Sequence, residues 1–386
     1  MKLFKLFRYQ LIICSVVLLL AACHEEPAPA PVLPVNRTVL VYMVASNNLG
    51  TGRFDEADLA EMQQAAKAGD ITDGRLLVYH VPPSGDPVLK EVTASGIDTL
   101  AMYDSETSSV SSVRMRAVFD DMRRVAPADE YGLVLWSHAS GWLQDGIDDE
   151  LDNAGEMVAP LAFGFDKGQK MNLTTLARTL QGQNFGFVYF DCCYMGSVEV
   201  AYELRRATPL IVGSPSELPS NGMPYNRNIR CFFAPEADLL TAARNTFELY
   251  DGEFGVNRTC TMSVINTAAL DGLAAVVRDI YSGASDPWPA GYEPQRYMTE
   301  SRCYHFDLGH YVEALGSDDA LLAEFRRFMD EAVLYEAATP FLWNRLAIES
   351  HCGLTTYIFE NEAQSRIKGY DTTSWFSDVA SELLTD

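Results

Sequence analysis

The sequence predicts an α/β fold: a mostly parallel β-sheet covered by helices on both faces, with a smaller, mainly helical C-terminal subdomain. Three observations predict this fold. Short apolar runs rich in β-branched residues alternate with segments whose apolar residues recur at helical spacing. The apolar runs are continuous, as expected for strands that are buried on both faces. Beyond residue 266 the helical spacing dominates.

The elements of the first half follow this alternation. Residues 38–45 (TVLVYMVA) form an apolar run that ends in turn-forming residues, so a buried strand is expected. Residues 55–68 have helical spacing with acidic residues in the first turns. Residues 76–81 are the next apolar strand, and the more polar runs 88–92 and 100–103 suit a sheet edge. A helix with basic residues in its last turn is expected over 110–125.

The second half continues in the same way. Strands are expected at 131–137, 185–190, 210–213 and 261–266, and helices at 172–180, 198–205 and 237–250. Asn172 or Thr174 is the predicted cap of the first of these helices. After residue 266 we expect helices at 268–281, 308–315 and 321–338 and a strand-like run at 354–359. These patterns divide the chain into an α/β domain at 37–266, in which the candidate catalytic residues described below lie, and a C-terminal subdomain at 267–386.

The N-terminus carries a predicted export signal. Three basic residues precede the apolar run 11–20, which is about half as long as a membrane-spanning helix and ends in Leu20-Ala21-Ala22-Cys23. This ending resembles a bacterial lipobox, so residues 1–22 are predicted to be a lipoprotein signal peptide and Cys23 the lipidated residue. An ordinary signal peptide is the alternative. Residues 23–36, rich in proline, form a tether, and the expected location is the outer membrane, at its periplasmic or cell-surface face.

The composition excludes one class of partner. The chain has 386 residues, of which 48% are hydrophobic and 21% charged, which is enough for a large core. Its 53 acidic and 29 basic residues give a net charge of -24, so no nucleic-acid partner is expected. This charge is typical of a soluble exported protein and would also attract a basic substrate.

Two strands end in residues that could perform covalent catalysis. His138 follows strand 131–137, and Cys193 follows strand 185–190. Because the carboxyl ends of parallel strands lie at the same edge, both side chains should reach one crevice, where a thiol with a base permits acyl transfer. The start of the next helix and His138 are expected to lower the pKa of Cys193. Backbone amides at Ala139 and Cys193 are candidates for an oxyanion hole.

Structural alternatives remain for each of these residues. Cys193 could fill the core, and His138 could be an ordinary residue at a strand end. Cys192 is the better core filler, because adjacent strand residues point to opposite faces. For the same reason the two cysteines cannot easily share a metal ion, and no metal site is expected. The other mature cysteines suggest no zinc site or disulfide framework, although a bridge between Cys303 and Cys352 stays open.

Several blocks of the sequence resemble the clostripain-like cysteine peptidases, which have the caspase and gingipain fold. The blocks are VYMVASNNL at 41–49, LVLWSHASGW at 133–142, FDCCYMGSVEVAYEL at 190–204, IVGSPSELPSNGMPY at 211–225 and HCGLTTYIF at 351–359. The resemblance implies a caspase-like sheet, with His138 as the general base or acid and Cys193 as the nucleophile. It also implies that Asp191 lies near the pocket for the P1 residue, where a carboxylate would pair with Arg or Lys. The alternative for Asp191 is a strand-end acid that accepts hydrogen bonds from local amides.

The chain departs from the family pattern at two places. Ala139 replaces the usual glycine after the histidine, which would place a methyl group near the scissile carbonyl. Asn221 stands in the loop where many relatives carry an acid, so the preference for Arg at P1 is left open. Glu217 could supply the missing carboxylate. We therefore expect Asp191, Glu217 and Asn221 to contact substrate.

The long acidic stretch between the histidine and cysteine strands is a further family feature. Relatives can mature by cleavage there, and Lys167 and Lys170 are the candidate basic cut points in this chain. Some relatives use Ca²⁺, and Asp145, Asp148, Asp149, Glu150 and Asp152 are acidic. They lack the ligand spacing of an EF-hand, so a solvated loop is favoured and no cofactor is expected, with Ca²⁺ as the weaker alternative.

Two functions are therefore compared. The first is a cell-envelope-anchored cysteine endopeptidase that uses a Cys-His dyad on a protein or peptide substrate and cleaves after Arg or Lys. The second is a catalytically weakened lipoprotein that binds peptides or glycans. In both, the N-terminal lipid would contact the membrane.

Overall fold

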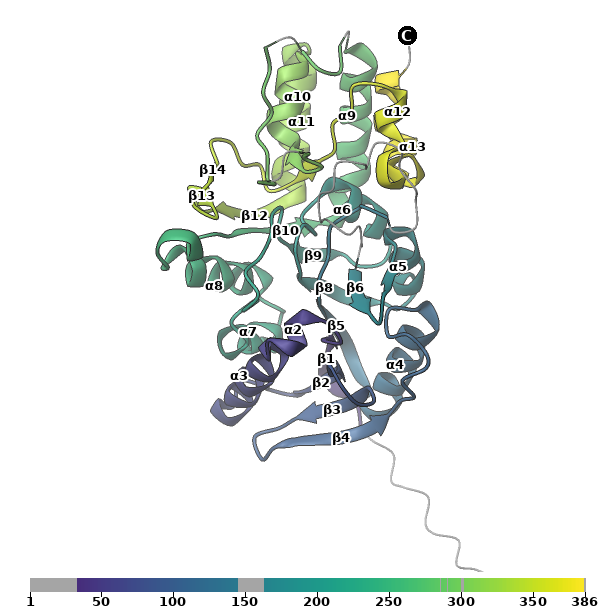
Figure 1. The fold of residues 1–386 in the computed structure, drawn as a ribbon, viewed down its shortest axis with the longest axis vertical. Helices are drawn as coiled ribbons and strands as arrows, with labels where there is room; N and C mark the ends of the chain where they lie inside the picture. The colour runs from purple at the N-terminus through teal and green to yellow at the C-terminus, as the bar shows by residue number, and fades with distance from the viewer. Residues whose placement is uncertain (1–32, 145–162, 285, 290, 300–301, 385–386) are drawn as a thin grey trace, which may run out of the picture. The chain divides into compact units, whose positions relative to one another are not determined.

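A nine-stranded mixed sheet organises the protein (Figure 1). The structure is a computed structural model that describes residues 33–144, 163–284, 286–289, 291–299 and 302–384, and residues Pro34–Asp386 form one compact unit. The strand order is β12-β10-β9-β8-β5-β1-β2-β3-β4. The five central strands are parallel: β9 (Leu210–Gly213), β8 (Phe185–Asp191), β5 (Ala128–Trp136), β1 (Val35–Val44) and β2 (Gly74–Val81). The predicted α/β class with a mostly parallel core is confirmed.

Antiparallel strands complete both edges of the sheet. At one edge lie β3 (Val88–Val92) and β4 (Ile97–Met102), and at the other lie β10 (Thr261–Asn266) and β12 (Val333–Ala338). The expectation that the polar runs near residues 88 and 100 form an edge is confirmed.

The central strands are apolar throughout because each face of the sheet has its own core. In β1, Leu40, Tyr42 and Val44 pack into one hydrophobic cluster. The alternate residues Val39, Val41 and Met43 pack into the other. Period-two alternation therefore produces a continuous apolar run when both faces are covered.

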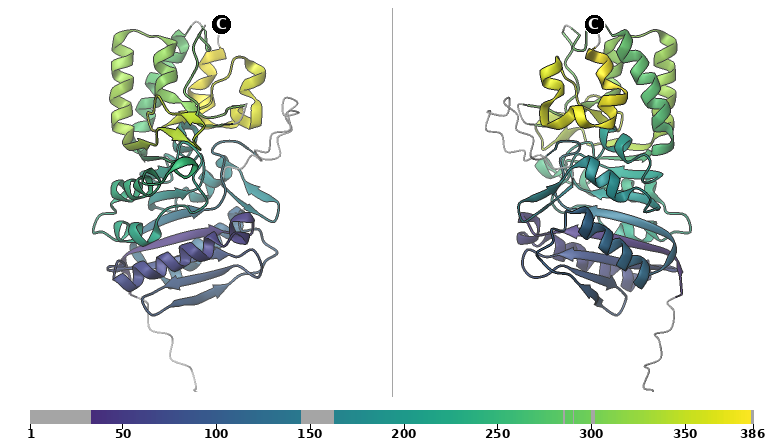
Figure 2. Two further views of the ribbon diagram at one scale, coloured as in Figure 1. Left: turned by 60° about the vertical axis from the view of Figure 1, so that its left-hand side comes forward. Right: turned by 90° about the vertical axis from the view of Figure 1, so that its right-hand side faces the viewer.

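Helices cover both faces, as Figure 2 shows from two sides. One face carries α3 (Phe54–Ala68), α7 (Tyr225–Phe232) and α8 (Leu239–Asp251). The other carries α4 (Ser112–Val125), α5 (Leu173–Leu180), α6 (Val198–Leu204) and α9 (Leu270–Gly283). Sequence analysis missed α7, a short helix of eight residues.

The C-terminal part contains α10 (Leu308–Leu315), α11 (Asp319–Ala332), α12 (Glu362–Ser365) and α13 (Ser374–Asp378). The helix expected over 321–338 is wrong beyond Ala332, because residues Val333–Ala338 form β12 and pair with β10. The run expected at 354–359 contains only the two-residue strand β15 (Thr355–Thr356), paired with β11 (Phe306–Asp307). The C-terminal part thus adds a strand to the main sheet, and the domain boundary at residue 266 stays a prediction.

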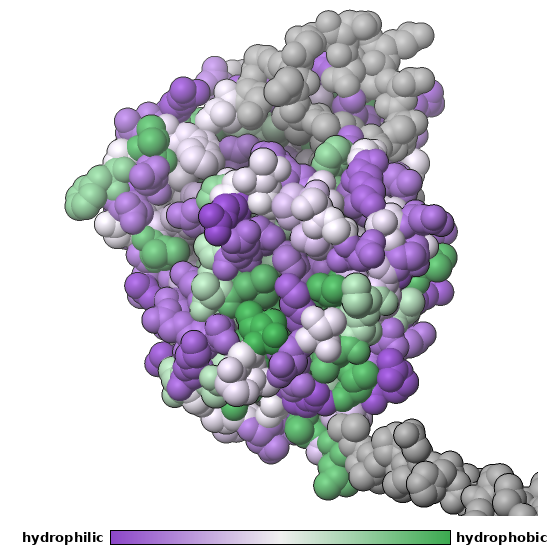
Figure 3. Space-filling model, turned by 60° about the horizontal axis from the view of Figure 1, so that its bottom comes forward, coloured by the Kyte–Doolittle hydropathy of each residue, from purple (hydrophilic) through white to green (hydrophobic). Residues whose placement is uncertain are grey.

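Short elements complete the fold near the carboxyl ends of the central strands. They are α2 (Asn48–Thr51), the hairpin of β6 (Phe163–Asp166) and β7 (Gln169–Met171), and the hairpin of β13 (Phe341–Leu342) and β14 (Leu346–Ala347). The face shown in Figure 3 is mainly hydrophilic and carries small apolar groups. None of the helices that the structure describes is long and apolar enough to cross a membrane. The predicted signal peptide 1–22, Cys23 and the acidic cluster at 145–152 lie outside the described residues.

Candidate active site

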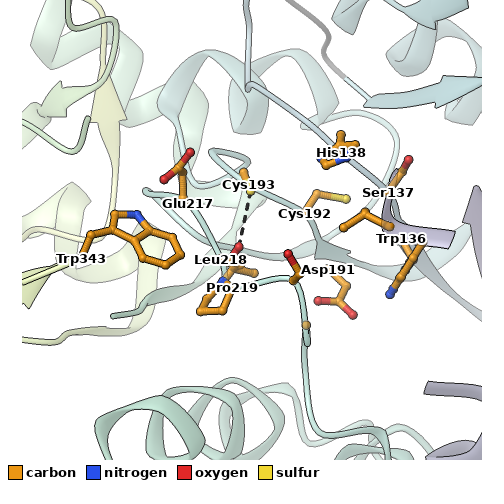
Figure 4. A pocket seen from close by; sticks show the side chains of 13 residues that line it. Trp136, Ser137, His138, Asp191, Cys192, Cys193, Glu217, Leu218, Pro219 and Trp343 are labelled. Atoms are coloured by element: carbon orange, nitrogen blue, oxygen red, sulfur yellow. Dashed lines mark hydrogen bonds between the residues drawn. The ribbon is translucent and has the colours of Figure 1, made fainter. Parts of the chain in front are cut away.

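A pocket of about 250 Å³ lies at the carboxyl ends of β5 and β8 (Figure 4). Its walls come from segments that are far apart in the sequence. The lining residues are Leu49, Trp136, Ser137, His138, Asp191, Cys192, Cys193, Glu217, Leu218, Pro219, Ser220, Gly222 and Trp343. The structure therefore brings the predicted residues His138, Cys193, Asp191 and Glu217 to one pocket.

The two adjacent cysteines have different surroundings. Cys192 is 3% exposed, and its thiol donates to the carbonyl oxygen of Leu135 at 2.9 Å within the core. Cys193 is partly exposed, and its thiol is directed toward the carbonyl oxygen of Leu218, 3.7 Å from the sulfur (Figure 4). Cys192 therefore packs in the core as expected, although both cysteines line the pocket and Cys193 is the more exposed of the two.

The expected activation of Cys193 by a helix end is wrong for this conformation. Helix α6 begins only at Val198, with Ser197 as its N-cap, so the turn 192–196 separates the sulfur from the helix. Burial, and to a smaller extent the nearby carboxylate of Glu217, raise the pKa of the Cys193 thiol to about 12. At neutral pH the sulfur is therefore protonated.

His138 is held by an amide that sequence analysis treated only as part of a loop. Its Nε2 lies 2.6 Å from Oδ1 of Asn48. Because an amide oxygen only accepts hydrogen bonds, Nε2 carries the proton and Nδ1 is the basic nitrogen. Burial lowers the pKa of His138, so the imidazole is neutral at neutral pH. Among the described residues, His138 and Cys193 form no hydrogen bond with each other.

The argument from parallel strand ends, which placed His138 in the site, also predicts a place there for Asn48. It begins α2 directly after β1, and β1 is parallel to β5 with Met43 opposite Trp136. The loops after these two strands therefore lie at the same sheet edge.

The loop after His138 contacts the turn that carries Cys193. Gly141 has a φ of 72°, and a Cβ placed there would lie 2.7 Å from Cε1 of His305 and 2.8 Å from the carbonyl oxygen of Tyr194. Only glycine fits this approach. Ala139 is 8% exposed and packs in the core without lining the pocket. The expectation that its methyl group lies near the scissile carbonyl stays a prediction.

Asp191 accepts local hydrogen bonds, as one of the two interpretations of the sequence expected, and its role toward a P1 side chain stays a prediction. Its Oδ1 accepts from the backbone N–H of Met223 at 3.0 Å, and its Oδ2 accepts from the hydroxyl of Tyr225 at 3.1 Å. Asp191 is also one of the residues that line the pocket. Burial raises the pKa of Asp191 to about 7, and the two hydrogen bonds oppose this rise.

Some residues of the loop 217–222 line the pocket and others do not. Glu217 lines the pocket. Gly222, with a φ of 62°, approaches Asp191 so closely that a Cβ would lie 2.6 Å from Oδ2. Asn221 is exposed and does not line the pocket, although its neighbours Ser220 and Gly222 do.

Trp343 was not predicted to contribute to the site. It lies in the turn between β13 and β14, has a φ of 51° and lines the pocket. Figure 4 shows its ring beside Glu217. No local pattern points to it, because its position depends on a hairpin from the C-terminal part.

The remaining predictions concern cysteines and metals. Cys303 and Cys352 are free thiols, so the bridge that the sequence left open is not formed. Over the part of the chain that the structure describes, no three His, Cys, Asp or Glu side chains are grouped to hold a metal ion. Lys167 lies in the turn between β6 and β7, where its Nζ donates to the carbonyl oxygen of Ser105 at 2.7 Å. Lys170 lies in β7.

Comparisons with known proteins agree with this architecture. The sequence model of the clostripain family matches residues 41–375. An inactive zymogen C11 protease from Parabacteroides distasonis has 29% identity and a TM-score of 0.77 over 90% of this chain and 99% of its own. A secreted C11 cysteine protease from Bacteroides thetaiotaomicron, solved with an irreversible peptide inhibitor, has 27% identity and a TM-score of 0.75 over 89% and 99%. No curated protein is significantly similar in sequence.

Proposed function

Since the chain belongs to the clostripain family of cysteine peptidases, we propose that it is an endopeptidase in which Cys193 is the nucleophile and His138 the general base. One observation carries this assignment: both side chains line a single pocket at the ends of the adjacent parallel strands β5 and β8. In many α/β sheets, ligands bind at this edge.

The chemical step begins from a neutral pair. As Sγ of Cys193 forms a bond to the carbonyl carbon of the substrate, its proton passes to Nδ1 of His138. The carbonyl electrons move to oxygen, and the backbone amides of Ala139 and Cys193 are the proposed donors to this oxyanion. The C–N bond then breaks, and the imidazolium gives its proton to the leaving amine. Water hydrolyses the thioester, with His138 again as base, and restores the thiol.

The neutral pair explains how the site can avoid unwanted reactions before substrate binds. A thiol with a pKa of about 12 is almost fully protonated at neutral pH and reacts slowly with oxidants and alkylating agents. The imidazole is unprotonated and ready to accept a proton. Substrate must therefore align the two groups before the thiolate forms.

Asp191 is the proposed partner of a basic P1 side chain. It lines the pocket, and its carboxyl group is fixed by Met223 and Tyr225, so it would pair with Arg or Lys without a large entropic cost. Glu217 adds a second acidic group on another wall. The peptide inhibitor in the related Bacteroides structure supports a peptide substrate for this chain as well.

Export and anchoring are the cellular part of the proposal. The basic residues, the apolar run and the lipobox-like ending at Cys23 favour a lipoprotein attached to the outer membrane. The secreted relative supports export. Labelling cells with a radioactive fatty acid tests the anchor: the protein should be labelled, and Cys23→Ala should remove the label.

A fluorogenic peptide assay tests the catalytic proposal. Substrates with Arg, Lys or a neutral residue at P1 are offered to purified protein, and Cys193→Ala is expected to abolish hydrolysis. Cys231→Ala is the matched control, because it removes a buried thiol on α7 that does not line the pocket, and should retain activity. Unchanged hydrolysis in Cys193→Ala would remove Cys193 from its proposed role.

The protonated thiol also favours a second candidate, a weakened enzyme that binds peptides or glycans. An iodoacetamide probe added with a substrate-like peptide separates the two. Labelling of Cys193 that is accelerated by the peptide supports the enzyme, whereas slow and unchanged labelling supports the binding protein.

A further inference from the structure

A buried histidine of the C-terminal part lies against both segments that carry the proposed catalytic residues. His305 directly precedes β11 and is 0% exposed. One segment is the loop 138–142, which begins with His138, and the other is the turn 192–196, which contains Cys193. His305 does not line the pocket itself, so any effect on the reaction must pass through these two segments.

The first contact joins His305 to the turn 192–196. Its ring is stacked on the ring of Tyr194, the residue after Cys193, with centroids 4.7 Å apart and an angle of 11° between the planes. Tyr194 has a φ of 60°, which a bulky residue adopts only where its surroundings hold it. The flat face of His305 is one of the contacts that keep Tyr194 in this conformation.

The second contact joins His305 to the loop 138–142. At Gly141 a Cβ would lie 2.7 Å from Cε1 of His305, so backbone and imidazole are closely packed. The next residue, Trp142, has its ring centroid 6.5 Å from that of His305 and 5.0 Å from that of Tyr357. The loop that follows the base therefore rests on rings of the C-terminal part.

A third contact fixes the imidazole from the opposite direction. Its Nδ1 lies 3.3 Å from Oγ1 of Thr355 in β15, and the N–H of Thr355 donates to the carbonyl oxygen of Gly196 at 3.0 Å. Burial lowers the pKa of His305 to about 3, so the ring is uncharged at neutral pH. His305 is thus an uncharged ring held between two catalytic segments and a strand of the C-terminal part.

We propose that His305 is a positioning residue for catalysis: its ring sets the spacing between the turn that carries Cys193 and the loop that carries His138. The inference rests on the proposed roles of Cys193 and His138. It extends to the proposed oxyanion donors, because the amide of Cys193 belongs to the turn and that of Ala139 belongs to the loop.

Such a role affects the rate of the chemical step more than substrate binding. The nucleophile, the base and the oxyanion donors must be aligned in the transition state, and a misplacement of about 1 Å can cost roughly 100-fold in rate. The acidic groups of the pocket come from other segments, since Asp191 ends β8 and Glu217 lies in the loop after β9. Loss of the His305 ring should therefore lower kcat and leave KM nearly unchanged.

Steady-state kinetics on a fluorogenic peptide test the inference. His305→Asn keeps a polar group near Thr355 but removes the ring, and should lower kcat at least about tenfold with KM changed less than about twofold. His351→Asn is the matched control, because it removes another histidine ring of the C-terminal part, one that contacts Tyr297 rather than the loop or the turn. Urea denaturation should show both variants folded, with kcat reduced only in His305→Asn.

Substitutions of Tyr194 show whether His305 acts through the stacked rings. Tyr194→Phe keeps the flat face and should retain kcat within about threefold, whereas Tyr194→Leu should lose at least about tenfold. Combining Tyr194→Leu with His305→Asn should add little to the slower single variant, because both changes break the same stack. Reductions that multiply in the double variant would overturn the inference.

The outcomes separate this inference from the proposed function. If Cys193→Ala is inactive and His305→Asn retains the kcat of the unsubstituted protein, the inference is overturned and the peptidase assignment stands. If the unsubstituted protein hydrolyses no peptide, or Cys193→Ala hydrolyses as fast, the proposed function fails and the inference fails with it. If His305→Asn does not fold, equal kcat values in Tyr194→Phe and Tyr194→Leu still overturn the inference.

Discussion

At the scale of single residues, the exposed amide of Asn48 fixes the chemistry of His138. Its Oδ1 accepts the Nε2 proton at 2.6 Å and leaves Nδ1 as the basic nitrogen. A carboxylate in this position would also raise the pKa of the ring, but an amide orients it without adding charge. His138 can therefore remain a neutral base despite its partner.

We predict that Asn48→Ala lowers kcat by about 10- to 100-fold and leaves KM nearly unchanged, because the imidazole loses its fixed tautomer and orientation. Steady-state kinetics on one fluorogenic peptide measure both constants. Asn48→Asp should restore most of kcat, since an acceptor oxygen returns, and should move the acidic limb of the pH profile upward. Full activity in Asn48→Ala would show that the amide does not position His138.

The pH profile should depend on the P1 residue. The lowered pKa of His138 means that the base stays unprotonated below pH 6.5, so the acidic limb for a neutral P1 substrate should lie below that value. An arginine substrate also needs ionised Asp191, whose pKa is raised to about 7. The ratio of kcat/KM for arginine over a neutral residue should therefore rise as pH increases through 7. A ratio that stays constant from pH 5 to 8 would argue against pairing with Asp191.

At the scale of elements, the turn between β8 and α6 positions the nucleophile. Tyr194 has a φ of 60°, and its N–H donates to the carbonyl oxygen of Ser216 at 2.9 Å. Ser197 then caps α6 by accepting from the N–H of Val200 at 3.2 Å. The backbone next to the cap bonds to the C-terminal part, since the N–H of Thr355 donates to the carbonyl oxygen of Gly196 at 3.0 Å.

Loss of this cap should affect both stability and catalysis. Ser197→Ala is expected to reduce the free energy of unfolding by about 1 kcal/mol and to lower kcat several-fold, because the turn that holds Cys193 loosens. Ser111→Ala is the matched control: Ser111 caps α4 through the N–H of Arg114 at 3.2 Å, away from the pocket. Urea denaturation should show a similar loss in both variants, with kcat reduced only in Ser197→Ala. Equal kcat values in the two variants would show that the Ser197 cap does not position Cys193 for catalysis.

The strand β12 illustrates where pattern reading fails at this scale. Its sequence, VLYEAA, continues the helical spacing of apolar residues in α11 and contains two alanines. The local pattern therefore predicts a helix. The chain leaves the helix because the edge of β10 offers backbone hydrogen bonds, and residues from Val333 to Ala338 pair with it. Pairing between distant segments overrides a local preference of this kind.

At the scale of the whole molecule, one buried acid connects α6 with the C-terminal part. Glu199 is 0% exposed, and its Oε1 accepts from the hydroxyl of Thr356 and the N–H of Tyr357, each at 2.9 Å. Burial raises the pKa of Glu199 to about 7, although its hydrogen bonds lower it. The group is therefore partly protonated near neutral pH.

This acid should make stability depend on pH. Because the pKa in the folded state is raised from 4.5, the contribution of Glu199 is complete below about pH 4.5 and is lost as pH rises through 7. The loss amounts to about 3 kcal/mol by pH 8. Glu199→Gln keeps the acceptor oxygen but cannot ionise, so its stability should fall much less between pH 5 and 8. Urea denaturation at both values measures the difference.

The exposed residue Glu362 provides the control for this prediction. Glu362→Gln removes a carboxylate from the surface of α12 and should leave the pH dependence as in the unsubstituted protein. The buried acids Asp58 and Asp191, whose pKa values are also raised, should preserve part of the slope in every variant. An unchanged slope in Glu199→Gln would show that Glu199 does not control stability in this range.

Most of the alternating strands and helices of the first 266 residues, and the placement of His138 and Cys193 at strand ends, could be predicted from the sequence. The helix α7 and the strand β12 could not. Periodicity and apolar runs are local properties, and parallel strands place their carboxyl ends at one edge whatever the details of packing. The family resemblance added the caspase-like topology and the expected roles, which the sequence blocks carry directly.

The electrostatics of the pocket, and the distant residues that build it, depend on how the folded segments pack together. The raised pKa values of Cys193, Asp58 and Asp191 arise mainly from desolvation, which depends on all the segments that bury each group. Trp343 reaches the pocket from a hairpin whose position requires the folded C-terminal part. Such properties belong to contacts between segments far apart in the chain, and no local pattern encodes them.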